Sequence, residues 1–248
     1  MEFKIPLIRG RLIRRLKRFI AEVILDSGQK VDVYCPNTGS MLGLAGPGMI
    51  VWLSENHDVK RKFRYTWELV EHSFTKGSTL VGVNTNNPNK IIGEAIACAG
   101  IQALKGYTKV RREVKYGKEN SRIDFLLEDV NKGLCYVEVK NVHLMRSPGL
   151  AEFPDSATKR GTKHLRELAE MVQRGHRAVI LFVVQRNDAL SMGLARDIDP
   201  NYANEFSISV KKGVEPLAFR CRVQTREIEI SEKIVFNDTL IYSPSNYS

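Results

Sequence analysis

The sequence predicts a mixed α/β (α+β) protein with two domains: a small β-barrel over residues 1–85, and a layered α/β domain over residues 86–248. Three observations support this prediction. Short segments separated by turn formers fill the first part, a polar run at 84–89 lacks apolar periodicity, and helical and strand patterns alternate beyond it. A chain of 248 residues also exceeds the size of an average single domain.

The N-terminal domain is expected to be a five-stranded, OB-like barrel. Short strands are predicted within 11–24 and at 30–35, 49–54, 63–71 and 79–84. Turn-forming sequences separate them, namely Asp26-Ser27-Gly28, Pro36-Asn37-Thr38-Gly39 and Gly46-Pro47-Gly48. Several short strands with frequent turns are typical of small closed barrels.

The second domain is expected to alternate helices and strands. A helix is predicted at 90–104, followed by strands at 109–116, 122–128 and 134–140 and a second helix at 158–174. A buried strand at 178–184, a helix at 201–212 and a strand at 214–223 extend this pattern. The order α-β-β-β-α with a further strand indicates a mixed sheet covered by helices.

Charge and cysteine content narrow the functional classes. The chain has 38 Lys and Arg against 28 Asp and Glu, and a net charge of +10 favours polyanionic partners such as nucleic acids. Its four cysteines form no Cys-x-x-Cys pair, which argues against a zinc ribbon or a dense disulfide framework. No apolar run is long enough to cross a membrane and no signal peptide is recognised, so we expect a cytoplasmic protein.

Two neighbouring strands carry the residues with the clearest chemistry. Strand 134–140 alternates, so Glu138 and Lys140 share one face and Val139 points to the other. The preceding strand is expected to place Ile123, Phe125 and Leu127 on its apolar face and Asp124 on the opposite one. If the two strands form a hairpin, Asp124 lies beside Glu138, and two carboxylates and an ammonium converge.

This convergence suits a hard divalent cation such as Mg²⁺ or Mn²⁺. These ions take oxygen ligands and keep several waters, so two carboxylates and a substrate phosphate make a suitable site. Lys140 is then placed to orient the attacking water or to stabilise developing charge at the phosphate. The alternative is that Glu138 and Lys140 form an exposed ion pair, which contributes only ~0–1 kcal/mol.

The spacing of Asp124 and Glu138-Val139-Lys140 resembles the bipartite signature of the PD-(D/E)XK nuclease superfamily, although Ile123 stands where the namesake motif has proline. Longer strings are similar to the sugar fermentation stimulation protein A family of prokaryotes, and together they span nearly the whole chain to about Phe219. They are Leu12-Ile13, Lys17-Arg18-Phe19, Cys35-Pro36-Asn37-Thr38-Gly39, Thr66-Trp67-Glu68-Leu69, Val114-Lys115-Tyr116-Gly117, Ser121-Arg122-Ile123-Asp124-Phe125, Tyr136-Val137-Glu138-Val139-Lys140, Phe153-Pro154-Asp155, Arg160-Gly161 and Lys163-His164-Leu165-Arg166-Glu167-Leu168.

The resemblance implies an N-terminal OB-like domain, a C-terminal restriction-endonuclease-like αβββαβ domain and DNA binding. It implies Asp124, Glu138 and Lys140 as catalytic residues, and Asp124, Glu138, Val139 and Glu94, an acid on the first helix, as metal-site residues. The alternative for Glu94 is a solvated helix charge. Asp155 follows a literal proline, but it comes after the Glu138 strand and before a helix, where an Asp more often serves a turn or cap.

Candidate nucleic-acid contacts lie in both domains. On the second helix Arg160, Lys163 and His164 share a face by their i, i+3, i+4 spacing. The full candidate set is Arg14, Arg15, Lys17, Arg18, Lys60, Arg61, Lys62, Arg64, Tyr65, Tyr116, Arg122, Arg160, Lys163 and His164. The alternatives are solvated charges, ordinary strand packing for Tyr116, and a barrel core that contains Phe19, Phe63 and Trp67.

These observations predict a Mg²⁺- or Mn²⁺-dependent nuclease that acts on DNA, with the barrel helping to hold the nucleic acid. Two alternatives remain open. One is a DNA-binding transcriptional regulator on the same fold with weak or absent hydrolysis. The other is an RNA-processing nuclease, because RNA and DNA present the same phosphates.

Overall fold

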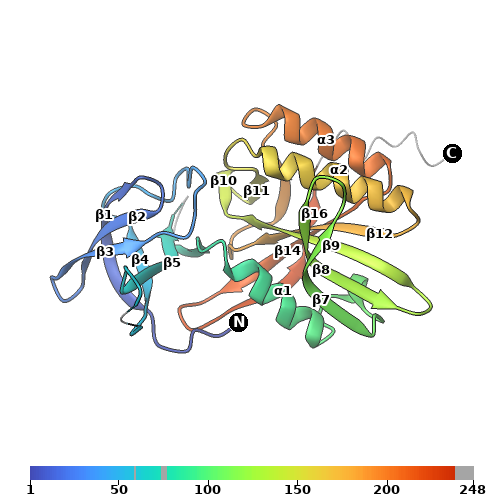
Figure 1. The fold of residues 1–248 in the computed structure, drawn as a ribbon. Coiled ribbons are helices and arrows are strands. Elements are labelled where there is room, and N and C mark those ends of the chain that lie inside the picture. Colours follow the sequence, from blue (N-terminus) through green and yellow to red (C-terminus); the bar gives the residue numbers. More distant parts are fainter. Residues whose placement is uncertain (59, 74–76, 238–248) are drawn as a thin grey trace.

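The computed structural model describes residues 1–58, 60–73 and 77–237, and it has two lobes (Figure 1). The smaller lobe is built from the first six strands and the larger one from the rest of the chain. None of the helices in the described part of the chain is long and apolar enough to cross a membrane.

The smaller lobe is a closed barrel, as predicted. Its strands are β1 (Ile8–Leu16), β2 (Ile20–Leu25), β3 (Lys30–Tyr34), β4 (Ile50–Glu55), β5 (Tyr65–His72) and β6 (Thr79–Gly82). They are hydrogen-bonded in the order β3-β2-β1-β4-β5-β6, and a parallel pairing of β3 with β5 closes five of them into an OB-like barrel. Alternation sets the interior: Val23, Val33, Leu53 and Trp67 are completely buried.

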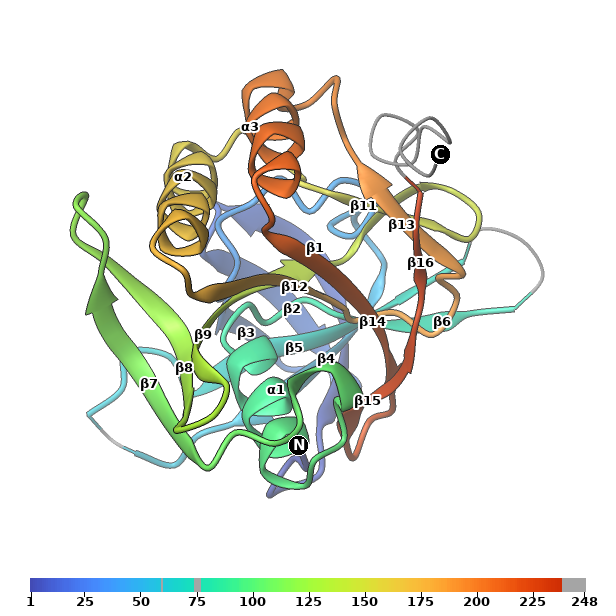
Figure 2. The same ribbon diagram turned by 90° about the vertical axis from the view of Figure 1, so that its right-hand side faces the viewer.

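The larger lobe is layered around a six-stranded mixed sheet of order β15-β14-β12-β9-β8-β7. Its strands are β7 (Lys109–Tyr116), β8 (Ser121–Asp129), β9 (Gly133–Val142), β12 (Arg177–Val184), β14 (Glu215–Val223) and β15 (Ile228–Lys233). The helices are α1 (Asn87–Ala97), α2 (Lys159–Gln173) and α3 (Pro200–Lys211). Figure 2 shows α1 on one face of this sheet and α2 and α3 on the other.

Two elements differ from the sequence prediction. The helix expected at 90–104 ends at Ala97, because Ala99 has a positive φ of 53° and Gly100 follows; a 3-10 turn at Gln102–Leu104 comes next. A second, four-stranded sheet of order β10-β11-β13-β16 was not predicted. Its strands, β10 (Leu144–Ser147), β11 (Leu150–Phe153), β13 (Ser191–Leu194) and β16 (Val235–Phe236), are too short for an alternation to be recognised.

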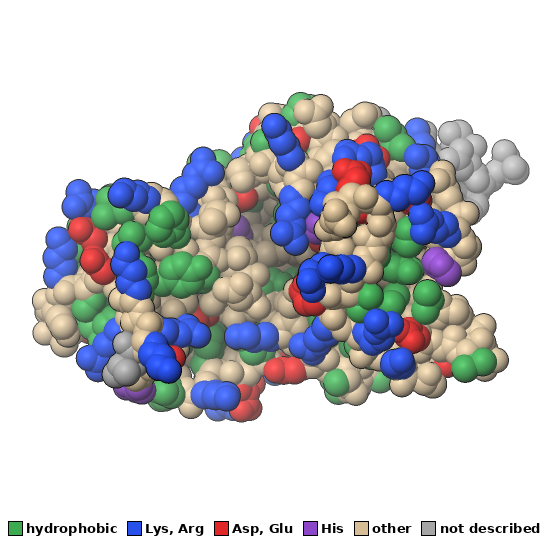
Figure 3. Space-filling view, viewed as in Figure 1, with side chains coloured by type: hydrophobic (Ala, Val, Ile, Leu, Met, Phe, Trp, Pro, Cys, Tyr) green, Lys and Arg blue, Asp and Glu red, His purple; other side chains and the backbone are tan. Residues whose placement is uncertain are grey.

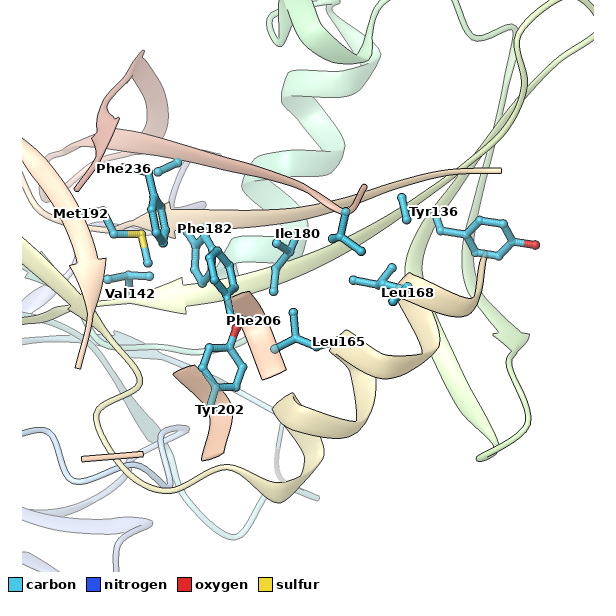
Figure 4. Close-up of a cluster of buried hydrophobic side chains, with 14 of the residues drawn as sticks. Tyr136, Val142, Leu165, Leu168, Ile180, Phe182, Met192, Tyr202, Phe206 and Phe236 are labelled. Atoms are coloured by element: carbon cyan, nitrogen blue, oxygen red, sulfur yellow. The ribbon is translucent and has the colours of Figure 1, made fainter. Parts of the chain in front are cut away.

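Two apolar cores lie on the two faces of the six-stranded sheet. Phe182, Tyr202, Phe206 and Phe236 are among the side chains between the sheet and helices α2 and α3 (Figure 4). The core on the α1 side also includes Leu69 of the barrel, so the two lobes share buried surface. Burial of this kind stabilises the arrangement by about 25 cal/mol for each Å² of apolar surface.

Polar contacts also join the lobes, and two of them run from the loop after β3 to Asp155. The amide of Met41 donates to Asp155 Oδ2 at 3.1 Å, and the Ser40 hydroxyl donates to the Asp155 carbonyl at 2.6 Å. His143 Nε2 lies 3.2 Å from the same Asp155 Oδ2. Arg15 shapes this loop by donating to the Gly39 carbonyl at 3.0 Å. Asp155 therefore holds the barrel loop in place, and its hydrogen bonds among the described residues are to Ser40, Met41, His143 and Ser156 rather than to the strands that carry Asp124 and Glu138.

Candidate active site

Asp124 lies where strands β8 and β9 separate. The two strands pair from Phe125 and Val137 to the hairpin end, and Asp124 is the residue just beyond the last pair. Its Oδ2 accepts a hydrogen bond from the Val139 amide at 2.7 Å, and its Oδ1 accepts one from the Asn89 side chain of α1 at 2.8 Å. The hairpin thus places Asp124 beside the Glu138 strand, and α1 fixes the orientation of its carboxylate.

The expected alternation along β8 is wrong for one residue. Phe125 and Leu127 pack in the core on the α1 side, but Ile123 packs in the core on the α2 side. The interruption falls at Asp124, opposite Glu113 of β7, whose positive φ of 53° distorts the hairpin there. The alternation therefore changes face at Asp124, so Ile123 and Phe125 lie on opposite faces of the sheet although they are two residues apart.

Glu138 is buried on the sheet face that α2 covers, and its two oxygens differ. Oε1 accepts a hydrogen bond from Lys140 Nζ at 2.7 Å and also contacts Nδ1 of His164. Oε2 is buried and has no hydrogen-bond partner among the described residues. Burial by itself would raise the pKa of Glu138, but the Lys140 ammonium and the contact with His164 outweigh it and lower the pKa. Glu138 is therefore a carboxylate with one oxygen that has no hydrogen-bond partner among the described residues.

Asp124 has the opposite shift. Burial first, and then the negative charge of Glu138, raise its pKa to about 6, although the Val139 amide and the Asn89 side chain favour its charged form. Burial contributes most to this raised pKa, and repulsion from the Glu138 carboxylate adds to it. A cation between the two carboxylates would remove this repulsion, so the site is electrostatically suited to a positively charged ligand.

Lys140 and His164 complete the cluster. The Lys140 ammonium is largely buried, with 12% of its side chain exposed, and its Nζ lies 3.5 Å from His164 Nδ1. His164 is 2% exposed and comes from the second turn of α2, so the helix presses it against the sheet. It is therefore a buried partner of Glu138 rather than part of an open basic face.

The donor set fits a hard divalent cation with few protein ligands. Among the described residues no group of three or more His, Cys, Asp and Glu side chains is arranged to hold a metal. Mg²⁺ commonly uses one or two carboxylates and completes its shell with water and substrate phosphate, and Asp124 and Glu138 can supply these. The buried Oε2 of Glu138, which has no hydrogen-bond partner in the described part of the chain, is the atom that such an ion would satisfy.

The other two predicted metal-site residues lie differently. Glu94 is exposed, and its carboxylate pairs with the N-terminal ammonium of Met1 at 2.7 Å, away from the contacts of Asp124 and Glu138. The Val139 side chain packs in the core on the α1 side, and its amide holds Asp124. On α1 the residue that reaches the cluster is Asn89, which the sequence did not single out.

The predicted nucleic-acid contacts of the larger lobe divide by burial. Tyr116 is buried and packs against Tyr136 with ring centroids 5.5 Å apart, so its ring is part of the core. Arg122 and Arg160 are exposed, and Lys163 is half-buried with Nζ donating to the Glu119 carbonyl at 2.9 Å. These three cations are on the surface, where phosphate can reach them.

The predicted contacts of the barrel also divide. Tyr65 is buried in the barrel with Trp67, because period two places both on the inner face of β5. Arg14 pairs with Glu22 at 2.7 Å, and Arg64 pairs with Glu55 at 2.5 Å. Arg15 donates to carbonyls of the loop after β3, so it has a structural role. Lys17, Arg18, Lys60, Arg61 and Lys62 are exposed, as are Arg14 and Arg64 despite their ion pairs.

A hollow separates the two lobes on the face shown in Figure 3. Lys and Arg side chains lie at several points around its rim. In the same orientation α1 lies below the hollow and α2 above it (Figure 1). These are the helices that contribute Asn89 and His164, so the cluster lies between elements that border the hollow.

Each of the two lobes matches a domain profile of known proteins. A family profile described as the sugar fermentation stimulation protein RE domain matches residues 86–227, and one described as the SfsA N-terminal OB domain matches residues 13–83. Sugar fermentation stimulation protein homologues of Azorhizobium caulinodans and Ruegeria are 50% and 51% identical, and each alignment covers 94% of this chain and 98% of the relative. The solved structure of Pyrococcus furiosus SfsA in complex with Ca²⁺ is 26% identical with a TM-score of 0.85, over 96% of this chain and 98% of that one.

Proposed function

This chain belongs to the sugar fermentation stimulation protein family, and on that premise we propose that it is a divalent-metal-dependent nuclease that cleaves DNA. One observation carries the proposal: Asp124, Glu138 and Lys140 meet at the point where β8 and β9 separate, and Glu138 retains a buried oxygen without a partner among the described residues. Two carboxylates and an ammonium are what hydrolysis of a phosphodiester needs beside a metal ion.

Each residue has a separate task in the proposed reaction. Asp124 and Glu138 would hold the ion, and the hydrogen bonds from Asn89 and the Val139 amide fix the Asp124 carboxylate. Mg²⁺ or Mn²⁺, when bound, polarises the phosphoryl group and lowers the pKa of a bound water. Lys140 stabilises the negative charge that develops on the phosphate.

His164 is the residue that keeps Glu138 in position. It contacts the same Glu138 oxygen as Lys140, and it is held by its place in the second turn of α2. With Oε1 fixed by these two partners, Oε2 is the oxygen left to face a metal ion. Groups that orient a metal ligand in this way are a regular part of metal sites.

The relative from Pyrococcus furiosus supports a hard cation as the ligand. Its structure contains Ca²⁺, and it shares its fold with this chain over nearly the full length of both. Ca²⁺, Mg²⁺ and Mn²⁺ all prefer oxygen ligands, so a site that accepts one is chemically suited to the others.

Nucleic acid is the substrate that the charge favours. The chain carries a net charge of +10, and cations border the hollow between the lobes in Figure 3. Neutralising phosphates with these side chains would release condensed counterions, which supplies affinity independent of sequence. The base identity and the sugar do not enter this argument, so the test must include RNA.

The experiment is a cleavage assay with four labelled substrates: single- and double-stranded DNA and RNA, each with EDTA, Mg²⁺ or Mn²⁺. The proposal predicts cleavage of DNA in the presence of metal and none in EDTA. Binding of DNA without cleavage under any condition would favour the regulator, and cleavage of RNA alone would favour the RNA-processing nuclease. The Asp124→Asn variant, purified in parallel, controls for contaminating nucleases.

A further inference from the structure

The outer surface of the barrel exposes aromatic rings. Among the described residues the large hydrophobic side chains that are exposed include only two aromatics, Phe19 at 45% and Tyr34 at 38%. Tyr34 also stacks on Phe63, with ring centroids 6.2 Å apart and planes 24° apart. Apolar side chains that are exposed next to one another, unlike single ones, often mark a binding site.

These rings gather at one part of the barrel. The amide of Cys35, next to Tyr34, donates to the carbonyl of Phe19 at 2.9 Å, so the turn between β1 and β2 lies beside the end of β3. Tyr34 pairs with Ile20 on one side and with Thr66 on the other, which places it between β2 and the start of β5. In OB folds the face of the second and third strands, with these flanking loops, is the surface that binds oligonucleotides.

Cations surround the rings. Lys62 Nζ lies 5.5 Å from the centroid of the Phe63 ring. Lys17 and Arg18 are exposed in the turn on one side, and Lys60 and Arg61 are exposed on the other. The acidic residue on this part of β2, Glu22, is already paired with Arg14 at 2.7 Å and Lys30 at 3.5 Å. Figure 3 shows hydrophobic side chains with Lys and Arg around them on the barrel lobe, on the same side of the molecule as the hollow.

We propose that Phe19, Tyr34 and Phe63 form a stacking platform for single-stranded nucleic acid. Aromatic rings bind bases through their faces, and in a duplex those faces are covered by neighbouring bases. The cations on both sides are placed to contact the phosphates of a strand whose bases lie on the rings. From the proposed function this inference takes only that nucleic acid is the ligand; it does not require that the chain cleave it.

The test is a binding titration of the full-length protein in EDTA, so that cleavage cannot interfere. The probes are labelled single strands of DNA and of RNA, the matching duplex, and a single strand of equal length whose central sugars carry no bases. Tyr34→Ala and Phe63→Ala should each weaken binding of the intact single strands by about fivefold to a hundredfold, the usual effect of one stacked base. Tyr34→Phe keeps the ring and should bind as the wild type does.

Two controls separate stacking from charge and from general hydrophobicity. Ile24→Ala removes a barrel side chain with the same 45% exposure as Phe19 but without a ring, and should leave affinity unchanged. Lys62→Ala should reduce the slope of log affinity against log salt by about one, whereas Tyr34→Ala should leave that slope unchanged.

The strand without bases gives the decisive comparison. The wild type should bind it more weakly than the intact strand, and Tyr34→Ala should make this difference smaller, because one of the three rings is gone. If Tyr34→Ala loses the same factor on both strands, or on duplex as much as on single strands, the platform does not stack bases and the inference is wrong. Cleavage of DNA with metal would still stand in that case, so failure of the inference is distinguishable from failure of the proposed function.

Discussion

Replacing Asp155 by Asn removes a charge at the contact between the two lobes while keeping the shape of the side chain. The carboxylate accepts the Met41 amide of the barrel loop and lies 3.2 Å from His143 Nε2, and only 16% of the side chain is exposed. Burial alone would raise the pKa of Asp155. The hydrogen bond and charge of His143 outweigh burial and lower the pKa to about 2, from an ordinary value of 3.8.

The magnitude follows from this shift. A carboxyl group whose pKa is lower in the folded protein favours folding when it is ionised. Its contribution is fully present above the unfolded pKa near 4 and is lost as the pH falls through the folded pKa of about 2. A pKa that falls from 3.8 to about 2 corresponds to roughly 2 kcal/mol at neutral pH, and to about half of that at pH 3.

The assay is urea denaturation of the wild type and Asp155→Asn at several pH values from 3 to 7. We expect the variant to be less stable by roughly 2 kcal/mol at pH 7, and the difference to shrink below pH 4. Asp32→Asn, an exposed Asp on β3, should show a much smaller difference at every pH. A difference that stays constant from pH 7 to pH 3 would refute the reasoning, because the charge of Asp155 would then not be its source.

Three further predictions test other parts of the account. Lys140→Ala should lower the cleavage rate by about a hundredfold with nearly unchanged DNA affinity, whereas Lys159→Ala on the exposed start of α2 should not change the rate. Equal losses of rate and affinity would make Lys140 a binding residue. A fragment that starts at residue 86 loses the buried contacts of Leu7 and Leu69, so urea denaturation should show it to be less stable than the full-length protein by about 3–6 kcal/mol. Equal stability of the two would mean that the lobes do not share a core. Tyr116→Phe removes a buried hydroxyl that has no partner among the described residues, so stability should not fall, and a clear loss would reveal a partner for that hydroxyl.

The parts of the site that depend on local sequence could be predicted. Alternation along β9 put Glu138 and Lys140 on one face, and the short hairpin connection brought Asp124 beside them. The same rule places Tyr65 with Trp67 on the inner face of β5, so the burial of Tyr65 follows from the sequence and the prediction that it contacts nucleic acid does not.

The parts that depend on packing between distant segments could not be predicted. Asn89 reaches Asp124 across 35 positions, and its polar run looked like a domain junction because a sequence does not show where a helix start will dock. The spacing of His164 on α2 fits an exposed basic face as well as a buried one, and only the packing of α2 on the sheet decides between them. The interruption of the alternation at Asp124 likewise depends on Glu113 of the neighbouring strand.

The most direct measurement is the rate of DNA cleavage over a Mn²⁺ titration, compared between the wild type and Asp124→Asn. Asn keeps an oxygen to accept the Val139 amide but removes the charge that would hold the ion, so the fold should survive, and circular dichroism can check it. The account predicts no cleavage in EDTA, a saturable increase with Mn²⁺ for the wild type, and a rate lower by about a hundredfold or more for Asp124→Asn. Cleavage by the wild type in EDTA, or an Asp124→Asn variant as active as the wild type, would contradict it.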